Sequence, residues 1–236
     1  ETGKIAPESR ILLVNDGSRD HTWSLIQELH AQCPLFSGVD LTRNRGHQNA
    51  LLAGLMTAKD RADMAISMDA DLQDDIDAVD AMVDKYYEGC DIVYGVRSSR
   101  EKDTFFKRMT AEGFYRLMNF MGADVVFNHA DYRLMSRRAL EGLAEFQETN
   151  LFLRGIVPMI GYNTGTVAYE RGERFAGESK YPLKKMLSFA LEGVTSLSTR
   201  PIRYISLLGV FIFMVSLVML LLIPLGKLSD HISVSY

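Results

Sequence analysis

The sequence has few cysteines, no excess of basic residues and no internal repeat, and each absence narrows the class of protein. Cys33 and Cys90 are the two cysteines, and their wide separation fits neither a disulfide framework nor a zinc site, so we expect reduced thiols. The net charge of -4 argues against the broad basic surface that nucleic-acid binding needs, so no nucleic-acid partner is expected. The 236 residues, 47% of them hydrophobic, suffice for one large domain or two small ones.

What the chain does have is one long apolar run near its end. Residues 204–226 carry no charged side chain, and this run is longer than the roughly 20 residues that a helix needs to cross a hydrocarbon core. We therefore expect a transmembrane helix, with a buried core helix as the alternative. Arg200 and Arg203 precede the run and Lys227 follows it, which favours a cytoplasmic position for the part before it.

Residues 182–203 have the pattern of an amphipathic helix. Their apolar residues fall on one helical face: Met186, Leu187, Ala190, Leu191, Val194 and Leu197. Directly before a transmembrane helix, such a segment is expected to lie in the membrane interface. The expected organisation is thus a catalytic domain over 1–181, a juxtamembrane helix over 182–203, a transmembrane helix over 204–226 and a tail over 227–236.

The region before residue 181 alternates short apolar runs with helical patterns. This alternation, with short connections, predicts an α/β fold with a mostly parallel sheet flanked by helices. Expected strands are 11–14, 39–41, 64–68, 91–95 and 163–170, and expected helices are 23–33, 47–58 and 78–89. Residues 105–121 carry a methionine and aromatic stripe that is more typical of a core helix than of a cofactor site.

Acidic side chains follow the third expected strand in the segment "SMDADLQDD", residues 67–75. In such sheets ligands bind beyond the carboxyl ends of the strands. Asp69 and Asp71 flank the small Ala70, so their carboxylates can converge on one cation, and Gln73 adds an amide oxygen. Oxygen ligands of this kind select Mg²⁺ or Mn²⁺. The alternative is a solvated acidic pair that caps a helix.

Six segments together resemble the family 2 glycosyltransferases of GT-A (Rossmann-like) fold. They also resemble, more narrowly, the bacterial polyprenyl-phosphate glycosyltransferases, relatives of dolichyl-phosphate mannose synthase. The segments are "VNDGSRDHT" (14–22), "LTRNRGHQNALLAG" (41–54), "MDADLQDD" (68–75), "VYGVR" (93–97), "DYRLMSRRAL" (131–140) and "ERGERFAGESKYPL" (170–183). The family's first strand, with its Tyr-Asn-Glu type of loop, is not found, so we expect part of the nucleotide site to lie outside these residues.

The resemblance implies a role for each matching residue. Donor binding is implied for Asp16, Asn44, Asp69 and Asp71, and metal binding for Asp69, Asp71 and Gln73. Asp16 also has the alternative role of capping the next helix. Binding of the acceptor phosphate is implied for Arg97, Arg108, Arg171, Ser179, Lys180 and Tyr181. For the basic residues among these, the alternative is a solvated surface charge.

Asp131 lies where relatives with hydroxyl acceptors keep a catalytic base. It is a candidate base or acceptor-orienting residue, alongside Asp71 and Arg97 as catalytic candidates, and a structural salt bridge to Arg133 or Arg137 is the alternative.

The implied reaction is the inverting transfer of one sugar from a nucleotide sugar, expected to be UDP-linked, to polyprenyl (undecaprenyl) phosphate. It would take place at the cytoplasmic face of the inner (plasma) membrane and supply sugar for cell-envelope glycans. A homo-oligomer formed through the apolar helix is also expected. The alternatives are transfer to a glycan or protein hydroxyl, with Asp131 as base, and a non-catalytic membrane scaffold.

Overall fold

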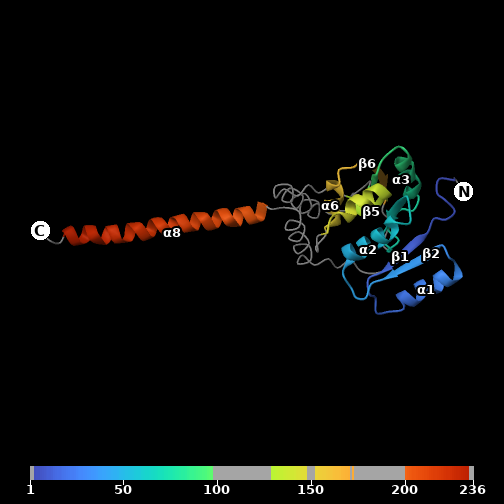
Figure 1. Ribbon diagram of the computed structural model, residues 1–236, viewed down its shortest axis with the longest axis horizontal. Coiled ribbons are helices and arrows are strands. Elements are labelled where there is room, and N and C mark those ends of the chain that lie inside the picture. The colour runs from blue at the N-terminus through green and yellow to red at the C-terminus, as the bar shows by residue number, and fades with distance from the viewer. Residues whose placement is uncertain (1–2, 98–128, 148–151, 171, 173–199, 234–236) are drawn as a thin grey trace.

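The structure of the protein is a computed structural model, shown in Figure 1. It describes residues 3–97, 129–147, 152–170, 172 and 200–233. Residues 3–8, before the first strand, form bends and a turn.

The first unit of the fold is a pair of parallel strands with two helices. β1 (Ile11–Asn15) pairs with β2 (Phe36–Asp40), and they are connected by α1 (Thr22–Gln32). Gly38 of β2 lets α1 approach closely, because a Cβ there would lie 2.6 Å from Ile26. Helix α2 (His47–Lys59) follows and contacts both β1 and β3 (Met64–Ser67). It therefore joins the two groups of strands.

The second unit is a four-stranded sheet in the order β3-β5-β4-β6. Strand β4 (Ile92–Arg97) runs parallel to β6 (Thr164–Tyr169), while β5 (His129–Ser136) runs antiparallel to both of its neighbours. β3, β4 and β6 therefore share one direction and β5 alone is reversed. The first residue of β5, His129, lies opposite Val96 near the end of β4, and Ser67 at the end of β3 pairs with Arg133 in the middle of β5, so this is the edge where ligands are expected.

Both faces of this sheet are covered, because successive side chains of a strand point to opposite faces. On one face Ile92 and Tyr94 pack with α5 (Arg137–Ala144) and α6 (Leu153–Met159). On the other, Val93 packs with Met82 and Val83 of α3 (Ala78–Tyr87). The sheet is therefore a rigid base for the loops at its edge.

The predicted α/β architecture is confirmed for the strands and helices that the sequence pattern indicated. The sheet is mostly parallel, as expected, and its exception is β5: β3 pairs with the reversed β5 rather than with β1 or β2. The expected helix over 105–121 lies outside the described residues.

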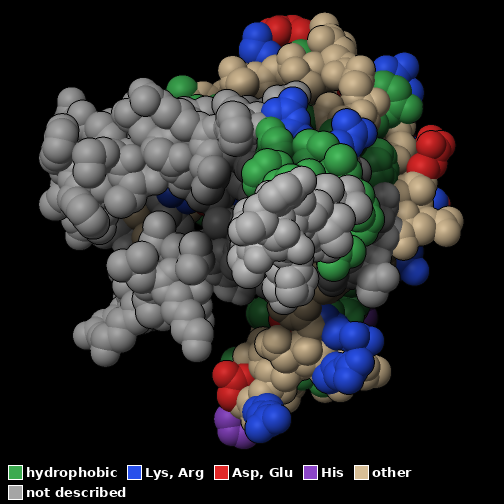
Figure 2. Space-filling view, turned by 90° about the vertical axis from the view of Figure 1, so that its left-hand side faces the viewer, with side chains coloured by type: hydrophobic (Ala, Val, Ile, Leu, Met, Phe, Trp, Pro, Cys, Tyr) green, Lys and Arg blue, Asp and Glu red, His purple; other side chains and the backbone are tan. Residues whose placement is uncertain are grey.

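The C-terminal helix α8 (Arg200–Ser233) projects away from the sheet and helices in Figure 1. Its stretch Ile202–Leu220 is long and apolar enough to cross a membrane, and none of it is buried. Figure 2 views the molecule from the side toward which α8 projects, and it shows apolar side chains gathered at the position of this helix. The expected transmembrane segment is thus helical from residue 204 on. Of the expected interfacial helix, residues 200–203 belong to α8 and the rest lies outside the described residues.

Candidate functional site

The loop after β1 is fastened to the loop before α2 by Asp16. Its carboxylate accepts hydrogen bonds from the backbone N–H groups of Arg45 (2.7 Å) and Gly46 (2.9 Å). Asn44 is exposed in the loop before α2, so two of the four expected donor-binding residues, Asp16 and Asn44, are neighbours. The alternative of Asp16 capping the next helix is not seen, since α1 begins after His21 without a side-chain cap.

The acidic loop after β3 is closed by a local hydrogen bond. The backbone N–H of Gln73 donates to Oδ1 of Asp71 at 3.1 Å, and Leu72 between them has φ +57°. A positive φ is uncommon for a residue other than glycine and is often found at functional sites. Burial raises the pKa of Asp69, and the charges of Asp131, Asp74 and Asp71 add to this while His47 opposes it.

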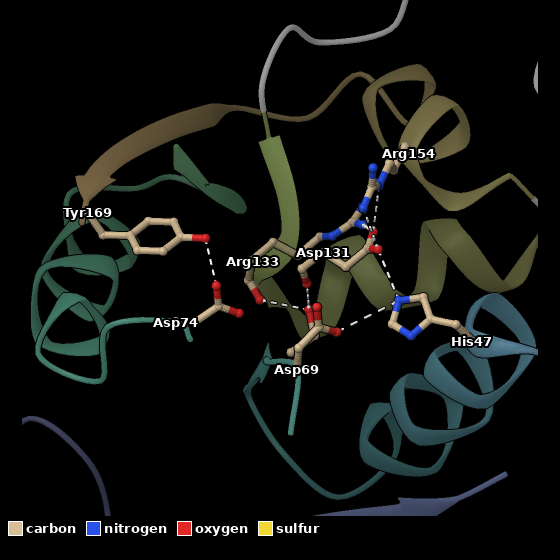
Figure 3. Close-up of polar contacts among 8 residues, drawn as sticks. His47, Asp69, Asp74, Asp131, Arg133, Arg154 and Tyr169 are labelled. Atoms are coloured by element: carbon tan, nitrogen blue, oxygen red, sulfur yellow. Dashed lines mark hydrogen bonds and ion pairs between the residues drawn. The ribbon is translucent and has the colours of Figure 1, made fainter. Parts of the chain in front are cut away.

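Asp131 lies at the centre of a group of basic side chains that come from three different elements (Figure 3). Its carboxylate accepts hydrogen bonds from Nη2 of Arg133 (2.6 Å), Nη2 of Arg154 (3.0 Å) and Nε2 of His47 (3.0 Å). The same Nε2 lies 3.9 Å from Asp69. His47 at the start of α2 therefore connects Asp131 to the acidic loop.

These partners decide the charge state of Asp131. Burial by itself would raise its pKa, but the hydrogen bond from His47 and the charges of Arg154 and Arg133 outweigh burial and hold the pKa well below its usual range. The same hydrogen bond raises the pKa of His47. A carboxylate with so low a pKa is a weak proton acceptor, so the geometry favours the orienting role over the base.

Of the two expected salt bridges of Asp131, the one to Arg133 is confirmed. Arg137 instead pairs with the exposed Asp63, at 3.1 Å.

A second polar group ties the acidic loop to the end of β6. The hydroxyl of Tyr169 donates to Oδ1 of the buried Asp74 at 2.7 Å, and Tyr132 donates to the backbone oxygen of Asp75 at 2.8 Å. Burial, with a further contribution from Asp74, raises the pKa of Tyr169 to about 12. Its hydroxyl therefore stays protonated and able to donate.

The acidic loop fits a divalent cation that is held by two carboxylates and not by a complete cage of side chains. Within the described residues, no three His, Cys, Asp or Glu side chains are grouped as a complete cage. Two carboxylates that leave other positions to water and substrate phosphates are, however, a usual Mg²⁺ arrangement. Asp69 fits this, because burial and three nearby carboxylates disfavour its charge and a cation would offset them. Asp71, two residues further along the same loop, is the second candidate ligand, and Gln73 places its amide nitrogen 3.4 Å from the carbonyl of Gly172.

The other expected site residues divide into two sets. Arg97 ends β4 directly beside Tyr169 of β6, at the same edge as the acidic loop. Arg108, Arg171, Ser179, Lys180 and Tyr181 lie outside the described residues.

His47, Arg154 and Tyr169 were not predicted from the sequence as site residues, and Asp74 was noted only as a member of the acidic segment 67–75. His47 follows the segment "RNRG", and Arg154 stands in the otherwise apolar "LFLRG", where a lone charge was the available signal.

Comparison with known proteins shows the family to which the chain belongs. Residues 5–143 match the family described as Glycosyl transferase family 2, and the chain belongs to this family. The Bacillus subtilis (strain 168) protein named uncharacterized glycosyltransferase YkoT is 58% identical over 91% of this chain and 64% of its own length. The bactoprenol glucosyl transferase of Shigella phage SfV is 41% identical over 89% of this chain and 68% of its own length. The chain thus spans roughly two thirds of these relatives.

Among solved structures, mannosyl-3-phosphoglycerate synthase from Rubrobacter xylanophilus aligns with a TM-score of 0.52 and 16% identity. The alignment covers 85% of this chain and 64% of that one. At this identity the likeness concerns the fold. The resemblance to family 2 and the GT-A-like α/β fold expected from the sequence are both confirmed.

Proposed function

We propose that this chain is a metal-dependent glycosyltransferase that moves one sugar from a nucleotide sugar to polyprenyl (undecaprenyl) phosphate, with inversion at the anomeric carbon. The observation that carries the proposal is the 41% identity, over 89% of the chain, to relatives named bactoprenol glucosyl transferase. The acidic loop at the edge of the sheet supports the transfer chemistry. A UDP-linked donor is our preference by analogy with the family.

The donor side of the reaction needs stabilisation of a leaving nucleoside diphosphate. Mg²⁺ or Mn²⁺ held by Asp69 and Asp71, with Gln73 beside them, would neutralise charge that develops on the diphosphate. Asp16 and Asn44 lie on the neighbouring loop and are assigned to the nucleoside. The chain's own contribution is a rigid edge, because Asp16 and Asp131 fasten these loops to the rest of the fold.

The acceptor side needs a second anion to approach the first. Charge-assisted hydrogen bonds from arginine and lysine are suited to this. We assign this role to residues that the family resemblance indicates: Arg97, Arg108, Arg171, Ser179, Lys180 and Tyr181. A lipid phosphate is already negatively charged near neutral pH and needs no strong base, which agrees with the low pKa of Asp131. We assign Asp131 to orienting Arg154 and His47.

The membrane location is part of the same proposal. The apolar stretch Ile202–Leu220 supports an anchor, and a lipid acceptor requires the site to lie close to the bilayer. We assign the catalytic part to the cytoplasmic face of the inner membrane, which the basic residues Arg200 and Arg203 at the start of α8 favour.

The test is a transfer assay with the full chain in membranes. Radiolabelled UDP-glucose, UDP-N-acetylglucosamine and GDP-mannose are each supplied with Mg²⁺ or Mn²⁺ and undecaprenyl phosphate, and the lipid is then extracted. We expect label in the lipid fraction from one UDP-linked donor, and its loss with a chelator. Label on a soluble hydroxyl acceptor instead would favour the alternative acceptor, and no donor turnover of any kind would favour a scaffold.

A further inference from the structure

The acidic loop is joined by hydrogen bonds to the end of β6 and to the residues directly after it, across a hollow. A cavity of about 560 Å³ is lined by Leu72 and Ile76 on the loop and by Glu170 and Gly172 on the segment. The side chains of Leu72 and Ile76 are 70% and 68% exposed. Side-chain packing therefore contributes little to the spacing between loop and segment, and the hydrogen bonds that bridge them must set it.

Three such bonds are present in the described residues. The hydroxyl of Tyr169 donates to Asp74 at 2.7 Å, the N–H of Gly172 donates to the carbonyl of Gln73 at 2.8 Å, and the Gln73 amide lies 3.4 Å from the carbonyl of Gly172. The first is the one made between two buried side chains, with Asp74 7% and Tyr169 3% exposed. It is thus the bond least open to competition from water.

The two partners are themselves held on rigid elements. The ring of Tyr169 packs edge-on against Tyr132 of β5, with centroids 5.1 Å apart and planes at 89°. Tyr132 in turn donates to the carbonyl of Asp75, next to Asp74. Figure 3 shows Tyr169 reaching from the end of β6 toward Asp74, which lies on the side of the acidic loop away from His47. The loop is therefore held from both sides.

We propose that Asp74 and Tyr169 are positioning residues, and that their hydrogen bond fixes the distance between the loop that carries the donor's metal ligands and the end of β6, where Arg97 of β4 lies beside Tyr169. This inference rests on the proposed function, because the assignment of Arg97 to the acceptor phosphate does. Neither Asp74 nor Tyr169 is assigned a contact with the reacting atoms. Their bond matters for transfer because a small misplacement of two reactants can lower a rate strongly.

The test separates this role from simple folding. Tyr169→Phe keeps the ring and removes only the hydroxyl, while Tyr87→Phe removes a hydroxyl that donates to the carbonyl of Lys4 far from the loop. For the full chain in detergent, we expect Tyr169→Phe to lower kcat/KM for undecaprenyl phosphate about tenfold. The KM for the nucleotide sugar should change less than about twofold. Tyr87→Phe should leave both parameters as in the wild type.

If Tyr169→Phe folds poorly, variants of Asp74 still test the inference. Asp74→Asn retains a carbonyl oxygen that can accept the hydroxyl of Tyr169, so its loss should be clearly smaller than that of Asp74→Ala. Equal losses in Asp74→Asn and Asp74→Ala, or equal effects of Tyr169→Phe on donor and acceptor parameters, would overturn the inference. If the wild type transfers no sugar to the lipid, the proposed function itself has failed, which is a different result.

Discussion

At the scale of single residues, the arginine at position 133 depends on one carboxylate. Arg133 is fully buried, and burial lowers its pKa while the charge of Asp131 raises it. Its Nε and Nη1 atoms have no hydrogen-bond partner in the described part of the chain. A buried cation of this kind is stable mainly because its counter-charge is present.

This dependence predicts a large effect of Asp131→Asn on stability. The substitution keeps the shape and removes the charge, so Arg133 loses its compensation, at a cost of about 3 kcal/mol or more in the free energy of unfolding. The matched control is Asp63→Asn, which breaks the exposed pair with Arg137 and should cost less than about 1 kcal/mol. Thermal unfolding of the full chain in detergent compares the two, and similar midpoints would contradict the prediction.

The expected loss of stability also affects how a loss of activity in Asp131→Asn is interpreted. An inactive Asp131→Asn protein would not identify a base, because the variant also disturbs Arg133, Arg154 and His47. Its activity is therefore informative only together with its melting temperature.

For Asp71→Asn we expect the opposite result, a large loss of activity with little loss of stability. An amide oxygen at this position can still accept the N–H of Gln73, so the loop should keep its conformation and the melting temperature should change little. Turnover should fall by about 10²-fold or more, since one of the two proposed metal-binding carboxylates is lost. Asp77→Asn, at an exposed position of the same region, is the control in the transfer assay. Near-normal turnover in Asp71→Asn would remove the metal assignment.

How much of the site was predictable follows from sequence distance. Asp69, Asp71 and Gln73 stand within five residues and directly after a strand, so local spacing predicted them as a group. His47 and Arg154 reach Asp131 from other elements, at sequence separations of 84 and 23. Their meeting depends on the arrangement of α2, β5 and α6, which no local pattern encodes.

At the scale of elements, the turn after β1 determines where Asp16 lies. Gly17 has φ +63°, and a Cβ there would lie 2.5 Å from the backbone carbon of Arg43. Glycine is thus required twice, for its conformation and for the close approach of two loops. The hydrogen bonds of Asp16 to Arg45 and Gly46 depend on this approach.

Gly17→Ala is therefore expected to cost roughly 3 kcal/mol of unfolding free energy, from the strained φ and the collision together. It should also raise the KM for the nucleotide sugar, because the donor loop moves. Gly46→Ala is the matched control: its φ is +84° but a Cβ there meets nothing within 4 Å, so roughly 1 kcal/mol is expected. Equal melting temperatures for the two variants would show that the contact with Arg43 is unimportant.

Elements also show where the prediction of the fold reached its limit. Short apolar runs and helical patterns were enough to predict β1, α1, α2, β3, α3, β4 and β6, and the expected strand 39–41 overlaps the end of β2. Their alternation predicted parallel strands, but β5, which mixes charged and apolar residues in "HADYRLMS", was not predicted as a strand, so its reversed direction was missed. Its charged members are buried because they pair with each other, which a hydrophobicity pattern cannot show.

At the scale of the whole molecule, α8 presents apolar side chains that no other described part of the chain covers. Phe211 and Val215 are 64% and 47% exposed, and the whole stretch Ile202–Leu220 is unburied. In water this would be a large aggregation-prone surface, whereas in a bilayer it is solvated by lipid. Lateral contact between α8 helices of two copies remains our expectation for a homo-oligomer.

The double variant Phe211→Arg/Val215→Arg tests this assignment. Each arginine at the centre of a membrane helix costs about 3 kcal/mol of insertion free energy, so we expect loss of the chain from the alkali-washed membrane fraction. Leu25→Arg/Leu29→Arg places the same pair, four residues apart, on exposed positions of α1 and should leave the chain in the membrane. Retention of both variants would argue against α8 as the anchor.

The reversed strand β5 has a consequence for the edge of the sheet where the acidic loop lies. Val96, near the end of β4, lies opposite His129, at the start of β5, so strand pairing itself holds these two ends together. The spacing of the two strand ends is therefore set by the sheet. We expect this edge to keep its width for as long as the sheet stays folded.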